Sequence, residues 1–90
     1  MQRGSTRRRS SSRLAPIGVQ LRTARLLRRL SQRDVAELTD YEVSYAGLSR
    51  IESGARYPTL HTLEALARAL DATFTITPEG TEMRLRLEMR

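Results

Sequence analysis

Four side chains between residues 45 and 52 have the chemistry to contact nucleobases if this segment forms a helix. Leu48 and Ile51 lie three residues apart and are expected to face a core. The outer side of the helix would then carry Tyr45, Ala46, Ser49 and Arg50. Arginine can donate two hydrogen bonds to O6 and N7 of guanine, alanine can contact the thymine methyl group, and tyrosine or serine can contact a base or a phosphate. These residue types are compatible with contacts to nucleic acid, although Tyr45 and Arg50 would also suit a helix face exposed to solvent.

Capping signals predict that this helix is the second of two short helices joined by a turn. Ser44 is a typical N-cap residue, and Gly54 supplies the left-handed residue that often ends a helix. Upstream, Ser31 and Asp34 have the spacing of a capping box, so an earlier short helix is expected to begin at Gln32.

A further helix is expected before this pair, over residues 17–28. Pro16 stands just ahead of it, at a position where proline is well tolerated. Its predicted buried stripe consists of Ile17, Leu21 and Ala24, with either Leu27 or Leu30 continuing it.

Another helix is expected after the pair, opened by Pro58 and Thr59. Its predicted buried face consists of Leu60, Leu63, Leu66, Ala67 and Leu70. Two short helices with a third packed behind them form a helix-turn-helix unit.

The charge of the chain is unevenly distributed. The 90 residues carry a net charge of +6, and every basic residue is arginine. Residues 1–29 contain nine arginines and no acid, whereas residues 30–90 contain ten acids and seven arginines. Such a basic block implies a polyanionic partner, most often nucleic acid, with a solvated tail of no specific role as the alternative.

The composition argues against a catalytic or metal site. There is no cysteine, and the one histidine, His61, has no neighbours of the kind that form a metal or catalytic cluster. The sequence also lacks a Ser-His-Asp set, paired carboxylates and a glycine-rich phosphate loop. No apolar run is long enough to span a bilayer. We therefore expect a non-enzymatic protein without metal, cofactor or membrane contact, located in the bacterial cytoplasm with the nucleoid.

An ordered series of short motifs resembles the Cro/C1-type (Xre family) helix-turn-helix DNA-binding domain. The matching pieces are Leu30-Ser31-Gln32, Val35-Ala36, Val43-Ser44, Leu48-Ser49-Arg50-Ile51-Glu52, Gly54, Arg56, Pro58, Leu60, Thr62-Leu63 and Ala67-x-Ala69-Leu70. The resemblance covers roughly residues 17–71 and implies a mainly α, lambda-repressor-like helix-turn-helix bundle over residues 16–71. One departure is the turn over residues 39–42, which is two residues longer than the usual Leu-Gly turn and contains no glycine. It puts the angle of the second helix in question.

The resemblance also implies roles for individual residues. Members of the family commonly contact bases through the first residues after the N-cap and through the residue that matches Arg50. Phosphate contacts are expected from Gln32, Arg33, Ser53 and Arg56. An ion pair between Arg25 and Glu52 would tie the first helix to the end of the base-contacting helix, with a surface arginine as the alternative. Gly47 would be explained by close packing against Ala36 or by close approach to DNA.

After residue 71 the pattern changes from helical to alternating. Residues 73–77 and the residues from 83 onward alternate apolar and polar side chains on either side of a turn-rich segment. This predicts a β-hairpin within residues 72–90, whose apolar face either lies on the helices or joins the hairpin of a second chain. The residues assigned to dimerisation are Phe74, Ile76, Met83, Leu85 and Leu87. A terminal strand in this place resembles antitoxins of the HigA and HipB type, in which such strands help to build the dimer.

Residues 1–15 are rich in arginine and serine and are expected to be disordered when free, because they cannot bury enough apolar surface to offset their ordering entropy. Arg7, Arg8 and Arg9 would contact phosphates if this arm embraces DNA. An inert tail and a targeting segment are the alternatives.

Together these features predict a dimeric, sequence-specific transcriptional regulator that binds an inverted repeat in double-stranded DNA and represses by blocking polymerase. As an antitoxin it would also bind a cognate toxin, whereas a stand-alone host or phage regulator would not. A protein-bridging or RNA-binding module that uses the same fold is the alternative from a different class.

Overall fold

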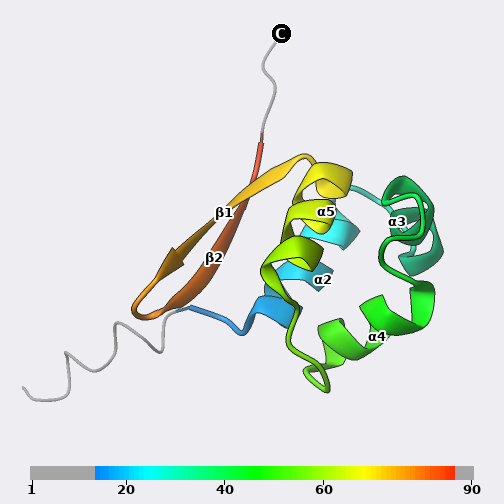
Figure 1. The fold of residues 1–90 in the computed structure, drawn as a ribbon. Helices are drawn as coiled ribbons and strands as arrows, with labels where there is room; N and C mark the ends of the chain where they lie inside the picture. Colours follow the sequence, from blue (N-terminus) through cyan, green and yellow to red (C-terminus); the bar gives the residue numbers. More distant parts are fainter. Residues whose placement is uncertain (1–13, 87–90) are drawn as a thin grey trace, which may run out of the picture.

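The computed structural model describes residues 14–86 and confirms a mainly helical helix-turn-helix fold with a C-terminal hairpin (Figure 1). In chain order the elements are α2 (Ile17–Leu27), α3 (Gln32–Leu38), α4 (Tyr45–Ser53), α5 (Leu60–Leu70), β1 (Ala72–Thr77) and β2 (Gly80–Leu85). The predicted phosphate contacts Arg7, Arg8 and Arg9 and the predicted dimerisation residue Leu87 lie outside the described residues.

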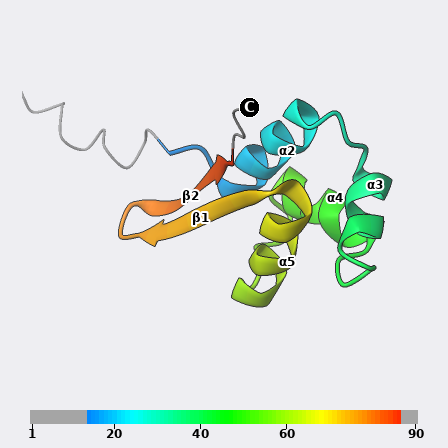
Figure 2. The ribbon, with the colours of Figure 1, turned by 90° about the horizontal axis from the view of Figure 1, so that it is seen from above.

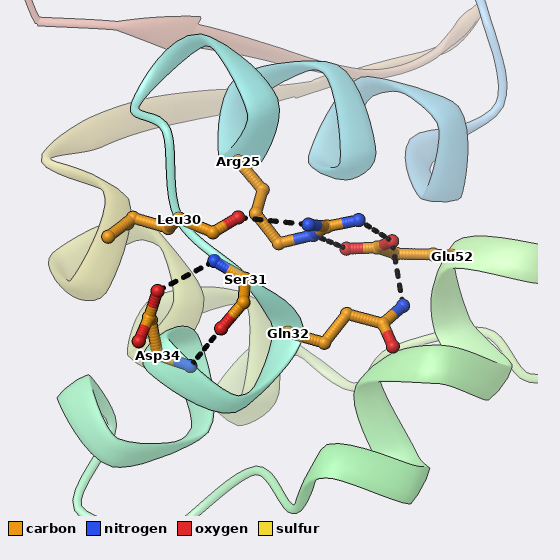
Figure 3. Close-up of polar contacts among 6 residues, drawn as sticks. All are labelled: Arg25, Leu30, Ser31, Gln32, Asp34 and Glu52. Atoms are coloured by element: carbon orange, nitrogen blue, oxygen red, sulfur yellow. Dashed lines mark hydrogen bonds and ion pairs between the residues drawn. The ribbon is translucent and has the colours of Figure 1, made fainter.

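The helices begin where the capping signals predicted. The Ser31 hydroxyl accepts a hydrogen bond from the Asp34 amide at 2.9 Å, and the Asp34 carboxylate accepts one from the Ser31 amide at 2.8 Å (Figure 3). This backbone hydrogen bond lowers the pKa of Asp34 below its ordinary value. The hydroxyls of Ser44 and Thr59 cap α4 and α5 by accepting hydrogen bonds from the Gly47 and Thr62 amides, and Gly54 ends α4 in the left-handed conformation at φ 87°. Local sequence chemistry therefore fixes the starts of these three helices and the end of α4.

One hydrophobic core joins the four helices and the start of β1. Its most completely buried side chains are Leu21, Val35, Leu48, Leu66 and Leu70. The predicted burial of Leu60 is wrong, because that side chain is 55% exposed. Of the two residues predicted to continue the stripe of α2, Leu27 is 67% exposed. Leu30 instead continues the stripe of α2, because it packs against the core after the chain has turned. The first turn of α5 thus projects beyond the core, and the helix is buried only from Leu63 onward.

A glycine sets the distance between α2 and α4. A Cβ atom on Gly18 would collide with the backbone carbonyl oxygen of Ile51, so no other residue fits without moving one of the helices. Of the two explanations predicted for Gly47, close packing against Ala36 is wrong, and close approach to DNA stays a prediction. The would-be Cβ of Gly47 lies 3.0 Å from the Ser44 hydroxyl and 3.8 Å from the Arg56 guanidinium, and Ala36 is not among its neighbours within 4 Å.

The long turn between α3 and α4 is folded compactly. Asp40 and Tyr41 both adopt left-handed backbone conformations, at φ 58° and 64°. The buried Thr39 hydroxyl donates to the Ala36 carbonyl at 2.8 Å and accepts from the Val43 amide at 3.2 Å. These bonds satisfy the backbone inside the turn, so the two additional residues leave the apolar side of α4 packed in the core.

The hairpin lies partly on the helices and partly beyond them. Its strands pair in register, with Phe74 opposite Met83 and Ile76 opposite Thr81. Phe74, Met83 and Leu85 pack against the core, whereas Ile76 is 63% exposed. Figure 2 shows the hairpin extending away from the body formed by α2 to α5, with its turn far from α3 and α4. Three of the predicted dimerisation residues therefore contact the helices of their own chain.

Candidate nucleic-acid interface

The outward side of α4 carries all four side chains that the sequence singled out for base contacts. Tyr45, Ala46, Ser49 and Arg50 are exposed. On the opposite side Leu48 and Ile51 are 1% and 3% exposed and belong to the core. The helix is thus held by its apolar side, and its polar side is exposed. Figure 1 shows α4 at the lower edge of the helical body.

A buried ion pair fixes the C-terminal part of α4 against α2. Arg25 Nε and Nη2 donate to the two carboxylate oxygens of Glu52 at 2.7 and 2.9 Å, and Arg25 Nη1 donates to the Leu30 carbonyl at 2.9 Å (Figure 3). The hydrogen bonds to Glu52 raise the pKa of Arg25 above its ordinary value. Because both charges are nearly inaccessible to water, this fork-to-fork geometry rigidly couples the two helices.

Gln32 extends this network from α3. Its Nε2 donates to Glu52 Oε1 at 3.0 Å, so that α2, α3 and α4 meet at one carboxylate (Figure 3). The side chain is half-buried, and its engaged amide braces α4 directly.

Arg33 and Tyr45 link the first turns of α3 and α4. The guanidinium carbon of Arg33 lies 4.6 Å from the centre of the Tyr45 ring, which is a cation-π distance. Both side chains are exposed. The stack presents one aromatic ring and one positive charge together at the amino end of α4, where the sequence had assigned them separately to base and phosphate contact.

Two more of the predicted phosphate contacts are Ser53, the last residue of α4, and Arg56, in the loop after it. The Ser53 hydroxyl donates to the Arg50 carbonyl at 3.0 Å and so helps to end the helix. Arg56 is exposed, lies beside Gly47, and makes no ion pair or side-chain hydrogen bond to any residue between 14 and 86. Its guanidinium is therefore available to an external anion.

Several arginines of the basic block have internal roles that the charge count did not reveal. Arg28 donates from Nε to the Leu70 carbonyl at 2.9 Å and from Nη2 to the carbonyls of Asp71 and Arg86 at 3.0 and 2.8 Å. Together with Arg25 it is used for structure, so the outward positive charge of residues 17–29 is carried by Arg22 on α2 and by Arg29 just after the helix. No local sequence signal distinguishes these two pairs, apart from the spacing of Arg25 beside the apolar stripe of α2.

The structure offers no sign of a metal centre or membrane span in the region that it describes. Between residues 14 and 86, no three histidine or acidic side chains gather where they could hold a metal ion. No helix in the same region is long and apolar enough to cross a bilayer.

The comparisons with known proteins agree with this geometry. A family model described as "Helix-turn-helix" matches residues 21–76, which is more than half of the chain and includes every element from α3 to α5. Neither the curated proteins nor the solved structures yield a match. The family consists of DNA-binding regulators, not enzymes. The chain belongs to the Cro/C1-type helix-turn-helix (Xre) family and is a DNA-binding helix-turn-helix regulator.

Proposed function

We propose that this protein is a transcriptional repressor that binds, as a dimer, an inverted repeat in double-stranded DNA. The observation that carries the proposal is the outward face of α4, where Tyr45, Ala46, Ser49 and Arg50 are exposed on a helix whose other side is buried. A rigid helix of this kind fits the major groove, where a bidentate arginine distinguishes guanine from the other bases. Bound over a promoter, the protein would repress by excluding polymerase.

The hairpin supports the dimer through an unpaired strand edge. Gln20 Nε2 donates to the Thr81 carbonyl at 2.6 Å, and Gln20 Oε1 accepts from the Met83 amide at 2.7 Å. These backbone groups of β2 therefore point away from β1. In an antiparallel pair their register partners Ile76 and Phe74 must also point their backbone groups outward, along the far edge of β1.

That far edge of β1 is open, at least toward the described residues, none of which forms a hydrogen bond with it. An open edge beside the exposed Ile76 is suited to pair with another strand. Pairing β1 with β1 of a second copy would form a four-stranded sheet around a two-fold axis and would also cover Ile76. The two copies of α4 would then face successive half-sites, about 34 Å apart on the duplex.

Selection of bound sequences from a random duplex pool tests the proposal. The expected result is an enriched half-site that occurs twice as an inverted repeat with centres about one helical turn apart. Arg50→Ala should relax the preference at one base pair of each half-site. Arg68→Ala, on the exposed side of α5, is the control and should leave the enriched sequence unchanged.

Two results would overturn the proposal. One is a pool in which no sequence is enriched, and the other is a protein that prefers structured RNA to the selected duplex at the same salt concentration. A pool enriched in single, unrepeated half-sites, together with a monomeric mass in solution, would remove the dimer while leaving the base contacts in place.

A second role, as the antitoxin of a toxin-antitoxin pair, is favoured by a groove on the side of α2 that faces the hairpin. The groove has a volume of about 630 Å³ and lies between α2 and β2. Its lining is mostly apolar and includes Val19, Leu27, Met83 and Leu85. Because it lies apart from the outward face of α4, a protein bound there would leave that face free.

Co-expression with the product of the neighbouring reading frame tests this role. A complex that dissociates on Leu27→Asp would support it, and the absence of any complex would count against it.

A further inference from the structure

A polar hollow lies along the edge of α4 that faces α2 and α3. It has a volume of about 340 Å³ and is lined by Arg22, Gln32, Ser49, Glu52 and Ser53. Ser49 and Ser53 stand one turn apart on α4, so the hollow follows the border of the face assigned to base contact. Arg22 comes from α2 and has no role in the predictions made from the sequence.

The charge of this hollow is positive. Glu52 is its one acid, but both carboxylate oxygens are engaged, by Arg25 on two sides and by Gln32 on a third. Arg25 neutralises that charge inside the protein, where both groups are buried. The side chain of Arg22 is exposed and forms no hydrogen bond or ion pair with any other residue that the structure describes. The uncompensated charge at the hollow is therefore that of Arg22.

The opposite edge of α4 has a matching cation. Gly47 lies on that edge, and the Arg56 guanidinium is 3.8 Å from the position that a Cβ atom there would occupy. The exposed face of α4 is thus bordered by Arg22 on the side of α2 and by Arg56 on the side of the loop before α5. A major groove is similarly bordered, since a phosphate backbone runs along each of its two walls, about 12 Å apart.

We propose that Arg22 binds a phosphate of the DNA strand opposite the strand whose phosphate is bound by Arg56, so that α4 is held between the two backbones. This inference rests on the proposed function, because it requires α4 to lie in the major groove. Arg22 would position the helix without selecting a base, and its loss should weaken all duplex sequences alike.

The first experiment measures affinity for the selected operator and for a random duplex at several salt concentrations. Arg22→Ala should reduce the magnitude of the slope of log K against log salt by about 1, the value for one lost phosphate contact. Its affinity for both duplexes should fall roughly tenfold at low salt. Arg22→Lys should keep the slope and recover part of the affinity, because the charge remains. Arg68→Ala removes the same charge from an exposed site on α5 and serves as the control.

The second experiment identifies which DNA strand carries the phosphate bound by Arg22 and which carries the one bound by Arg56. Neutral methylphosphonate linkages are placed one at a time along each strand of the operator. The parent protein should lose affinity at one position on each side of the groove. Arg22→Ala should become insensitive at the position on one strand, and Arg56→Ala should become insensitive at a position on the other.

The outcomes separate the inference from the proposed function. If the parent protein fails to bind duplex DNA, the proposed function fails and the inference fails with it. If the parent binds but Arg22→Ala keeps the same slope as Arg68→Ala, the inference alone is overturned. Insensitivity of both variants on the same strand would also overturn it. Because Arg22 is exposed, Arg22→Ala should unfold in urea at the parent's midpoint, and Arg22→Gln replaces it if that midpoint falls.

Discussion

The helical body and the hairpin are held in place by different means. The body, α2 to α5, is organised around a continuous apolar core and a buried ion pair between Arg25 and Glu52. The hairpin is held at separate points, by Arg28 at its base, by Gln20 along β2, and by a few half-buried side chains. Beyond these points its turn extends away from the body (Figure 2).

This difference separates two tasks that a DNA-binding regulator must perform. The core of the body and the hydrogen bonds to Glu52 set the orientation of α4, so the proposed base contacts should not depend on the hairpin. Gln20 occupies one edge of the hairpin and leaves the other edge without a hydrogen-bond partner among residues 14–86, so the proposed pairing with a second chain should leave α4 undisturbed. The comparison predicts that a substitution in the body lowers the stability of the whole domain. A substitution that releases the hairpin should affect mainly the hairpin.

The largest effect is expected from breaking the ion pair in the body. Glu52→Ala leaves the Arg25 guanidinium buried without a counter-charge and should lower the free energy of unfolding by about 3–5 kcal/mol. Urea unfolding followed by circular dichroism measures the change. Glu37→Ala removes an exposed acid from α3 and should change stability by less than about 0.5 kcal/mol. Equal losses in the two variants would show that the Arg25–Glu52 pair contributes no more than a surface charge.

The same contrast explains how much could be predicted from the sequence. Helix boundaries were predictable because Ser31, Ser44, Gly54 and Thr59 act on backbone groups within four residues of themselves. The outward face of α4 followed from the spacing of its apolar residues. In both cases the signal and its effect lie in the same short segment.

Contacts between distant segments were not predictable in this way. Gln20 bonds to β2 residues more than 60 positions away, and Arg28 bonds to carbonyls 42 to 58 positions away. Nothing in the residues around either side chain marks it for these bonds. Gly18 was missed for the same reason, since the carbonyl that requires a glycine there belongs to α4. Leu60 shows the converse case. The helical spacing of apolar residues in α5 begins at Leu60, one turn before the helix reaches the core, so this side chain is exposed.

A smaller and local effect is expected from releasing the hairpin. Gln20→Leu removes the bonds to the Thr81 carbonyl and the Met83 amide and should lower global stability by about 1–3 kcal/mol at most. The loss is limited because water can solvate the freed strand edge. Hydrogen exchange should accelerate at the Met83 amide while the amides inside α4 keep their protection. The experiment thus tests whether the hairpin moves independently of the body.

Thr23→Ala is the matched control for this release. Thr23 lines the same groove from the same helix, and no bond joins it to β2 among residues 14–86. The Met83 amide should exchange at the parent's rate in this variant. If Gln20→Leu accelerated exchange equally in α4 and in β2, the hairpin would be an integral part of the body, and the separation of tasks would be wrong.

The smallest effect is expected from relieving backbone strain within the body, in the connection between α2 and α3. Arg29 joins α2 to α3 with a left-handed backbone at φ 61°, which costs an L-residue roughly 1–2 kcal/mol and costs glycine nothing. Glycine loses more chain entropy on folding, so Arg29→Gly should stabilise the protein by only about 0.5 kcal/mol. Arg22→Gly makes the same exchange inside α2 and should destabilise by about 1 kcal/mol. Opposite shifts of the two urea midpoints would show that the body retains strain in this connection, whereas a loss of stability in both variants would contradict the left-handed backbone at Arg29.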